Sequence, residues 1–292
     1  MKRGSRYNGP VRGPSFLLSA AITFATGACI LDLDNLSGAC VSATCDGGRE
    51  DGATPKTDGG GDALAPSGDA ATPCPSLHGP TPVRVVTRAG AFCIDATEVT
   101  VAQYGEFLQA KGADTSGQPT ECSTNTTFAP LTPGAPPTSA IGGVDWCDAL
   151  AFCTWSGKTL CGGFDGAAIE PSKANDPTVS TWFAACSNDG KQPYPYGAVV
   201  DLARCNSSER TTSPIAASTT CAGGYAGIFD LSGNVEEWTA SCESPNPKAG
   251  CLARGGNYST TSDAELGCST STQRLEIRDS AEPWRGIRCC SR

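Results

Sequence analysis

The chain has 292 residues, a formal net charge of −9, a pI near 4.7, 17 cysteines and a single histidine. The acidic balance and the lack of a basic face exclude a nucleic-acid-binding protein, and the single histidine excludes histidine-dependent triads and iron sites with several histidines. The cysteines form no CxxC pair or Cys/His cluster, so they favour disulfides in an oxidising compartment over structural zinc. His78, the one histidine, is expected to be exposed to solvent.

The first 28 residues predict a secretory signal peptide. Basic residues precede an apolar run at residues 16–24, which is too short to span a bilayer. Residues 26–29, TGAC, resemble a bacterial lipobox with Thr26 in place of the usual leucine, which makes Cys29 a candidate for lipidation. Acylation of Cys29 leaves sixteen of the 17 cysteines for eight disulfides, whereas cleavage by an ordinary signal peptidase leaves an odd cysteine.

Residues 29–76 are rich in Gly, Asp, Ala and Pro and contain few large apolar side chains. Such a segment cannot bury a core, so we expect a flexible tether. Within it, Cys40 and Cys45 are expected to close a small loop. The remaining residues, 77–292, are sufficient for one domain with its own core.

The domain is predicted to begin with a hairpin whose strands lie at residues 83–86 and 91–94. Thr100 is then expected to cap a helix, because Gln103 completes a capping box and Gly112 provides a stop. The polar, proline-rich residues 111–138 indicate a long surface loop, held by its cysteine at position 122.

Two further helices are expected. Asp145 is predicted to cap one that ends at Gly157, and residues 181–186 predict another, with Trp182 and Phe183 in the core. The cysteine spacing then suggests disulfides, because partners must approach within about 7 Å between their Cα atoms. We expect Cys242 to pair with Cys251, Cys268 with Cys289 or Cys290, and Cys161 with Cys147 or Cys153.

Residues 230–238, DLSGNVEEW, combine carboxylates with a glycine-containing turn. Asp230 and Glu237 can supply carboxylate oxygens, and Gly233 and Val235 can supply carbonyl oxygens. Together they provide four of the about six to eight oxygens that calcium takes. The competing interpretation is a tight turn before a packed tryptophan, since Asp, Ser, Gly and Asn are also common turn residues. The stretch therefore predicts either a structural calcium site or a plain turn.

Five separated blocks carry a family resemblance: FCIDATEVTVAQYGEFL, GGVDWCDALAFCTWSGKTLC, GIFDLSGNVEEW, ARGGNY and GIRCC. In order and spacing they resemble the formylglycine-generating enzyme, or sulfatase-modifying factor, family over about residues 82–290. The resemblance implies an α+β fold that is irregular and disulfide-rich, similar to the C-type lectin fold, with short helices and strands. It also implies a second calcium position at Asn206 and the Ser207 carbonyl.

Enzymes of this family convert a cysteine in a CxPxR-type peptide of a sulfatase to formylglycine, using oxygen and one copper ion bound by two cysteine thiolates. Such soft ligands suit copper(I). The aligned positions here hold Thr260 and Glu265, and Asn257 stands where a serine is usual. No cysteine lies between Cys251 and Cys268, and Cys268 is better explained by a structural disulfide. Copper is therefore not expected, and no catalytic residue is assigned.

Two functions compete. The favoured hypothesis is a secreted or lipid-anchored, non-catalytic module that binds a peptide, glycan or cell-envelope partner through its loops. The alternative is a formylglycine-generating-type oxidase that acts on a protein cysteine. Both place the chain outside the cytoplasm, as a secreted protein or a bacterial cell-envelope lipoprotein that contacts membrane only through an N-terminal lipid. In either case, Arg254 and Arg288 are expected to form buried ion pairs.

Overall fold

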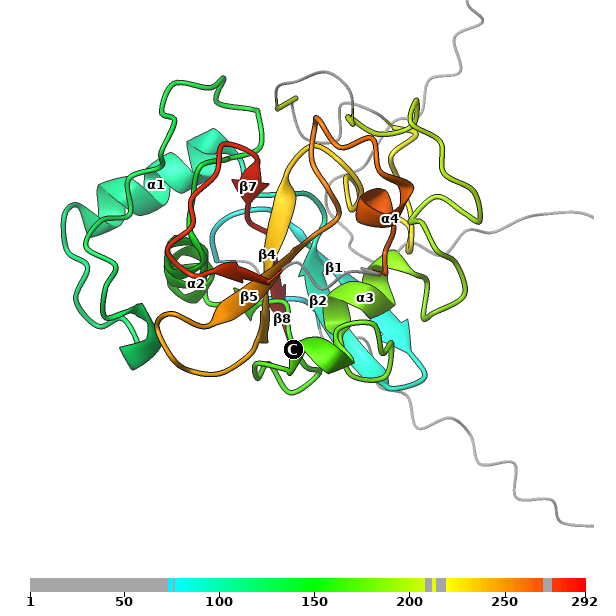
Figure 1. Ribbon diagram of the computed structural model, residues 1–292, viewed down its shortest axis with the longest axis horizontal. Coiled ribbons are helices and arrows are strands. Elements are labelled where there is room, and N and C mark those ends of the chain that lie inside the picture. The colour runs from blue at the N-terminus through cyan, green and yellow to red at the C-terminus, as the bar shows by residue number, and fades with distance from the viewer. Residues whose placement is uncertain (1–72, 76, 208–211, 214–218, 270–274) are drawn as a thin grey trace, which may run out of the picture. The chain divides into compact units, whose positions relative to one another are not determined.

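The computed structural model describes residues 73–75, 77–207, 212–213, 219–269 and 275–292, all within the unit Leu64–Arg292 (Figure 1). The predicted signal peptide, Cys29 and the predicted Cys40–Cys45 loop lie outside the described residues. Among the helices of the described part, none is both long and apolar enough to cross a membrane.

Short helices and strands joined by long irregular segments make up the described chain, which confirms the predicted α+β class. The strands are β1 (Pro82–Thr87), β2 (Gly90–Asp95), β3 (Thr159–Leu160), β4 (Glu236–Cys242), β5 (Gly250–Arg254), β6 (Leu275–Ile277), β7 (Arg285–Gly286) and β8 (Cys289–Ser291). The helices are α1 (Val101–Lys111), α2 (Trp146–Trp155), α3 (Thr181–Cys186) and α4 (Asp263–Leu266), with 3₁₀ turns η1 (Thr120–Cys122) and η2 (Pro171–Lys173).

The strands form two four-stranded sheets in the described part. One has the order β1-β2-β8-β3, with antiparallel neighbours throughout, and the other has the order β6-β5-β4-β7, in which β7 runs parallel to β4. Strand β8 therefore inserts between β2 and β3. This insertion brings Cys289 and Cys290, near the end of the chain, against segments that precede them by more than a hundred residues.

The predicted hairpin and first helix are confirmed. β1 and β2 pair in register from Pro82 opposite Asp95. At the start of α1, the Thr100 hydroxyl accepts a hydrogen bond from the Gln103 backbone N–H at 3.2 Å, and the Gln103 side chain accepts one from the Thr100 backbone N–H at 2.9 Å. These two bonds satisfy donors that a helix start leaves unpaired. Gly112 ends the helix with a positive φ of 59°, which glycine adopts readily.

Helix α2 begins with a second reciprocal capping pair. Asp145 accepts from the Asp148 backbone N–H at 2.8 Å, and Asp148 accepts from the Asp145 backbone N–H at 3.3 Å. The helix ends at Trp155, two residues before the predicted Gly157. Burial, followed by the Asp145 charge, raises the pKa of Asp148 to about 8. Burial also raises the pKa of Asp145 to about 6.

These pKa values predict that stability falls as the pH rises. A carboxyl whose pKa is raised by folding binds its proton more tightly in the folded state. Its contribution to the free energy of unfolding is therefore complete below the unfolded pKa near 3.8 and is lost as the pH rises through about 8. We expect Asp148→Asn to flatten the slope of unfolding free energy against pH by up to about 1.4 kcal/mol per pH unit. Urea unfolding at several pH values between about 5 and 9 measures this slope. An unchanged slope would contradict the assignment.

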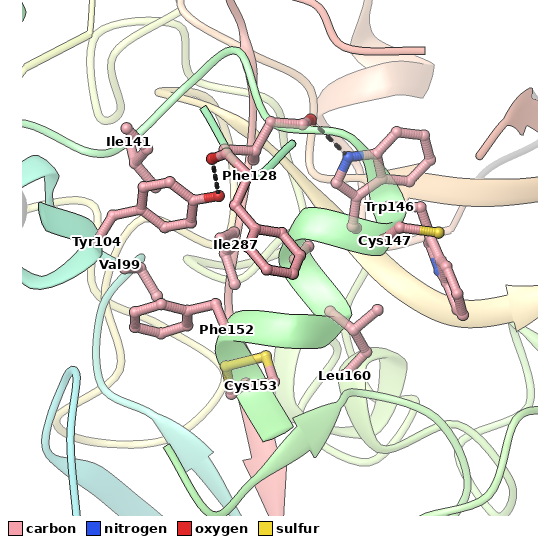
Figure 2. Close-up of a cluster of buried hydrophobic side chains, with 14 of the residues drawn as sticks. Val99, Tyr104, Phe128, Ile141, Trp146, Cys147, Phe152, Cys153, Leu160 and Ile287 are labelled. Carbon is pink, nitrogen blue, oxygen red and sulfur yellow. Dashed lines mark hydrogen bonds between the residues drawn. A yellow bond between two sulfur atoms is a disulfide. The ribbon is translucent and has the colours of Figure 1, made fainter. Parts of the chain in front are cut away.

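Two hydrophobic clusters form the described core. The first joins α1, α2 and β4 and contains Tyr104, whose hydroxyl donates to the Phe128 carbonyl at 2.8 Å (Figure 2). The second joins α3 to β1 and β2 and contains Trp182 and Phe183, as predicted. In Figure 1, α1 and α2 lie on one side of β4 and α3 lies on the other. His78 is exposed, as expected, and its ring stacks on a helix α2 tryptophan.

Candidate functional site

The turn before β4 connects two distant segments of the chain. Asp230 and Asn234 have φ angles of 61° and 57°, which these residue types tolerate better than most. A Cβ on Gly233 would lie 2.4 Å from the Asn206 carbonyl oxygen, so only glycine fits there. The same carbonyl accepts from the Asn234 backbone N–H at 2.7 Å, and the Gly233 N–H donates to Gly255 at 2.8 Å. The turn therefore joins the Asn206 segment to the RGGNY block.

A buried glutamate that the sequence reasoning missed holds this turn in place. Glu98 accepts hydrogen bonds from the Asn234 side-chain amide at 2.6 Å and from the Val235 backbone N–H at 3.0 Å. Burial raises the pKa of Glu98 well above its usual range, and the carboxylates of Asp230 and Glu237 raise it further. The available signal was the acidic pair Asp95 and Glu98 in the largely apolar stretch ahead of α1.

Arg288 and Glu237 form a fully buried ion pair, as predicted for Arg288. The Arg288 Nε donates to Glu237 Oε1 at 2.7 Å, and Trp182 Nε1 donates to Glu237 Oε2 at 2.6 Å. The other Arg288 nitrogens donate to the carbonyls of Asp95 and Phe229, each at 2.7 Å. Burial alone would lower the pKa of Arg288, but Glu237 and Glu98 outweigh it and raise that pKa.

Arg254 is also buried, but its described partners are neutral. It donates to the Ala174 carbonyl at 2.6 Å, to the Asn175 side-chain oxygen at 2.8 Å and to the Cys268 carbonyl. Its guanidinium lies 4.7 Å from the Trp182 ring centroid. Burial without a paired carboxylate lowers the pKa of Arg254 to about 9. The predicted ion pair is thus replaced by carbonyl, amide and aromatic contacts.

Two of the four residues proposed for the first calcium position, Glu237 and Asp230, have other close neighbours in the fold. The Glu237 oxygens accept hydrogen bonds from Arg288 and Trp182. Asp230 is buried near the Glu98 carboxylate. In the part of the chain that the structure describes, no group of three or more His, Cys, Asp or Glu side chains could hold a metal. The close packing of this turn favours the turn interpretation, and calcium binding stays a prediction.

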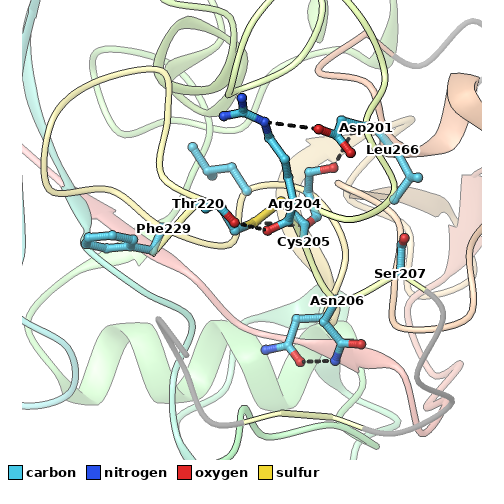
Figure 3. Close-up of a disulfide and its surroundings, with 12 residues drawn as sticks. Asp201, Arg204, Cys205, Asn206, Ser207, Thr220, Phe229 and Leu266 are labelled. Atoms are coloured by element: carbon cyan, nitrogen blue, oxygen red, sulfur yellow. Dashed lines mark hydrogen bonds and ion pairs between the residues drawn. A yellow bond between two sulfur atoms is a disulfide. The ribbon is translucent and has the colours of Figure 1, made fainter. Parts of the chain in front are cut away.

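The residues proposed for the second calcium position lie beside this turn. The Asn206 side chain donates to Asn234 Oδ1 at 3.1 Å and to the Ser213 hydroxyl at 2.7 Å. Ser207 is buried, and its hydroxyl donates to the Leu202 carbonyl at 3.3 Å. Figure 3 shows Asn206 and Ser207 directly after the Cys205–Cys221 disulfide. The two predicted positions are therefore adjacent in the fold, joined by hydrogen bonds between asparagines.

At the positions aligned to the copper thiols, the side chains are oxygen-bearing. Thr260 is buried and its hydroxyl accepts from the Asn257 backbone N–H at 3.0 Å. Glu265 lies in α4. The Asn257 side chain donates to Glu236 at 2.9 Å, and Glu236 faces Arg285 at 3.5 Å. This arrangement provides hydrogen-bonding and charged groups where the family chemistry requires sulfur.

All fourteen described cysteines are disulfide-bonded. The pairs are Cys74–Cys93, Cys122–Cys147, Cys153–Cys289, Cys161–Cys290, Cys186–Cys268, Cys205–Cys221 and Cys242–Cys251. The Cys242–Cys251 prediction is confirmed. The predicted partners of Cys268 and Cys161 are wrong, because the insertion of β8 brings Cys290 to Cys161 and the packing of α3 brings Cys186 to Cys268. This number of disulfides is typical of an exported protein.

The fold and the site define a formylglycine-generating-enzyme-like domain that lacks the thiol pair at its aligned positions. The chain belongs to the sulfatase-modifying factor family, since the model of the sulfatase-modifying factor enzyme 1-like domain matches residues 53–292. Family membership confirms the resemblance inferred from the five sequence blocks.

Curated relatives include the proteins named inactive C-alpha-formylglycine-generating enzyme 2 of Mus musculus and of Bos taurus. Each is 30% identical over 164 residues, which is 51% of this chain and 47% or 48% of the relative. The chain thus spans about half the length of the curated relatives it matches. Among solved structures, PvdO from Pseudomonas aeruginosa is 18% identical with a TM-score of 0.47, and the match covers 75% of this chain and 92% of the PvdO chain. CarF is 20% identical with a TM-score of 0.45, and the match covers 69% of this chain and 86% of the CarF chain.

Proposed function

We propose that this chain is an exported, non-catalytic binding module of the sulfatase-modifying factor family, anchored through a lipid at Cys29 or secreted. The observation that carries the proposal is the state of the cysteines. Thr260 and Glu265 occupy the aligned copper positions, and Cys268, the nearest cysteine that follows them, is bonded to Cys186. Because copper(I) needs free thiolates, this arrangement offers none at the family's site.

The naming of the curated relatives as inactive enzymes supports the same proposal. The buried interactions of Glu98 and Arg288 hold the loops of this fold in place. The thiol pair that binds copper in the family enzymes is absent at the aligned positions, so the loops can form a binding surface without the oxidation chemistry. We propose that its loops bind a peptide or glycan partner at the cell envelope. A structural calcium ion at the turn before β4 remains part of the proposal, with backbone carbonyls rather than Glu237 as its ligands.

We expect no formylglycine formation by the full-length protein. Alkylation of the unreduced, chelator-treated protein under denaturing conditions, followed by peptide mass mapping, is expected to label none of the fourteen described cysteines. The protein should also leave a CxPxR peptide unchanged in the presence of copper(I) and oxygen. A family enzyme with both thiols serves as the positive control. Turnover of the peptide, or labelling of Cys186 and Cys268 in the unreduced protein, would favour the oxidase alternative.

The variant Thr260→Cys/Glu265→Cys tests the alignment itself. If these positions correspond to the lost thiol pair, the double variant should bind copper(I) in competition with a chelator, while each single variant should not, because one thiolate is a weaker site than two. The wild-type protein provides the baseline. Equal copper(I) affinity of the wild type and the double variant would show that the aligned positions are not the copper site.

A further inference from the structure

A shallow hollow of about 300 Å³ is formed by residues other than those at the aligned copper and predicted calcium positions, and we call it the tyrosine pocket. Its walls include Gln192, Tyr196 and Tyr225, and its floor is the backbone at Gly223 and Gly224. Every residue that lines it is uncharged. Neutral lining is notable in a chain with a net charge of −9.

The floor of the tyrosine pocket is bare backbone because side chains cannot fit there. A Cβ on Gly223 would lie 1.8 Å from the Pro195 carbonyl oxygen, and one on Gly224 would lie 1.7 Å from the Ala185 carbonyl oxygen. Gly224 also has a φ of 69° and donates to the Pro195 carbonyl at 2.7 Å. The two loops that form the pocket are therefore fixed against each other, so the pocket is largely preformed.

The aromatic walls are supported by their neighbours. The Tyr196 ring stacks on Tyr194, with 5.7 Å between centroids and 11° between planes. Tyr225 packs against the second core cluster. Burial and then the Asp189 carboxylate raise the pKa of Tyr225, so its hydroxyl keeps its proton at neutral pH. Rings that are already held in position lose little side-chain entropy when a ligand binds.

The polar groups of the pocket need a partner that both donates and accepts hydrogen bonds. The Gln192 side-chain N–H donates to the Pro195 carbonyl at 2.6 Å, which leaves the Gln192 oxygen as an acceptor. The hydroxyls of Tyr196 and Tyr225 have no hydrogen-bond partner among the residues that the structure describes. Each hydroxyl can donate and accept. A ligand here therefore meets aromatic surface and three polar groups.

The charged groups near the rim of the tyrosine pocket do not favour a charged ligand. Arg204 lies 5.8 Å from the Tyr196 ring centroid, but its guanidinium pairs with Asp201 at 3.3 Å (Figure 3). On the Tyr225 side, the nearby Asp189 carboxylate likewise faces an arginine, Arg88, at 3.8 Å. A neutral ligand is consistent with both sides of the pocket.

We propose that the tyrosine pocket binds a neutral saccharide. This proposal rests on the proposed binding function and names the class of its ligand. The C–H faces of a sugar ring pack on aromatic rings, and its hydroxyls both donate and accept, as the three polar groups require. A proline-rich peptide also packs on aromatic surfaces. However, proline has no backbone N–H, so a run of prolines offers no donor to the acceptor oxygen of Gln192.

Titration calorimetry of the full-length protein with cellotriose, maltotriose, mannotriose and the N-acetylglucosamine trimer tests the proposal. We expect saturable binding of at least one of them, and a rise in Kd of at least about tenfold for Tyr196→Ala and for Tyr225→Ala. Tyr225→Phe removes only the hydroxyl and should weaken binding less than Tyr225→Ala. Val199→Ala changes an exposed residue of the same loop outside the pocket and should keep Kd within about twofold. Circular dichroism confirms that each variant is folded.

Two outcomes would overturn the proposal. They are no saturable binding of any of the four sugars, whether or not a proline decamer binds, and sugar binding that neither alanine variant weakens. Neither of these results bears on whether the protein oxidises a cysteine peptide, so failure here is distinguishable from failure of the non-catalytic assignment. A proline decamer that binds in place of the sugars would keep the binding function and change its ligand to a peptide.

Discussion

Replacing Arg288 with methionine is expected to lower the free energy of unfolding by about 3–5 kcal/mol, because one partner of a buried ion pair is left without compensation. Arg288 is 0% exposed and Glu237 is 1% exposed. The substitution also removes the donors to the carbonyls of Asp95 and Phe229. Denaturant unfolding of the disulfide-intact protein, with an unchanged m-value, measures the loss.

A matched arginine tests whether the cost comes from burial. Arg88 lies 3.8 Å from Asp189, but its side chain is 61% exposed. Arg88→Met should therefore change stability by less than about 1 kcal/mol. The double variant Glu237→Gln/Arg288→Met should be more stable than Arg288→Met alone, since it removes the unpaired carboxylate. A loss below about 1 kcal/mol in Arg288→Met would contradict the assigned role of the pair.

The sequence predicted the helix starts and the one disulfide that depend on residues close together in the chain. The capping box at Thr100 and Gln103 fixes the start of α1, and Asp145 fixes the start of α2. The short spacing of Cys242 and Cys251 sufficed to pair them, because the strands β4 and β5 that contain them are consecutive. These features depend on residues a few positions apart, so no knowledge of the tertiary fold was needed.

The features that were mispredicted depend on contacts between distant segments. Cys161 pairs with Cys290 because β8 inserts between β2 and β3. The spacing of cysteines along the sequence does not reveal this strand order. Likewise, the local sequence could not show the hydrogen bonds of Glu237, because their donors Arg288 and Trp182 are both more than fifty residues away. Glu98 was missed for the same reason, since its partners lie in the turn before β4.

The second large effect is expected at the buried pair of Lys158 and Asp95. The Lys158 Nζ lies 2.5 Å from Asp95 Oδ1 and also donates to the Pro80 carbonyl at 2.9 Å. The Asp95 side chain is 0% exposed, and its other oxygen accepts from the Cys289 backbone N–H at 3.0 Å. The pair thus joins β2, β3 and β8 at the centre of one sheet. Lys158→Met should cost about 3–5 kcal/mol, because it leaves this carboxylate buried without its cation.

A surface pair provides the control. Lys248 lies 2.5 Å from Asp279, the same separation, but the two side chains are 64% and 39% exposed. Lys248→Met should therefore cost no more than about 1 kcal/mol. Adding Asp95→Asn to Lys158→Met should recover part of the loss, since it removes the unpaired charge. Equal losses for Lys158→Met and Lys248→Met would contradict the role assigned to burial.

The cost of Lys158→Met should also depend on pH, which separates a charge effect from a packing effect. Burial already raises the pKa of Asp95 to about 6, against the opposing effect of Lys158, so removal of Lys158 should raise that pKa further. A carboxyl with a raised folded pKa contributes stability that is complete below its unfolded pKa and is lost as the pH rises through the folded value. The variant should consequently lose more stability, relative to the wild type, at about pH 8 than at about pH 5. A cost that is the same at both values would show that Lys158 acts through packing alone.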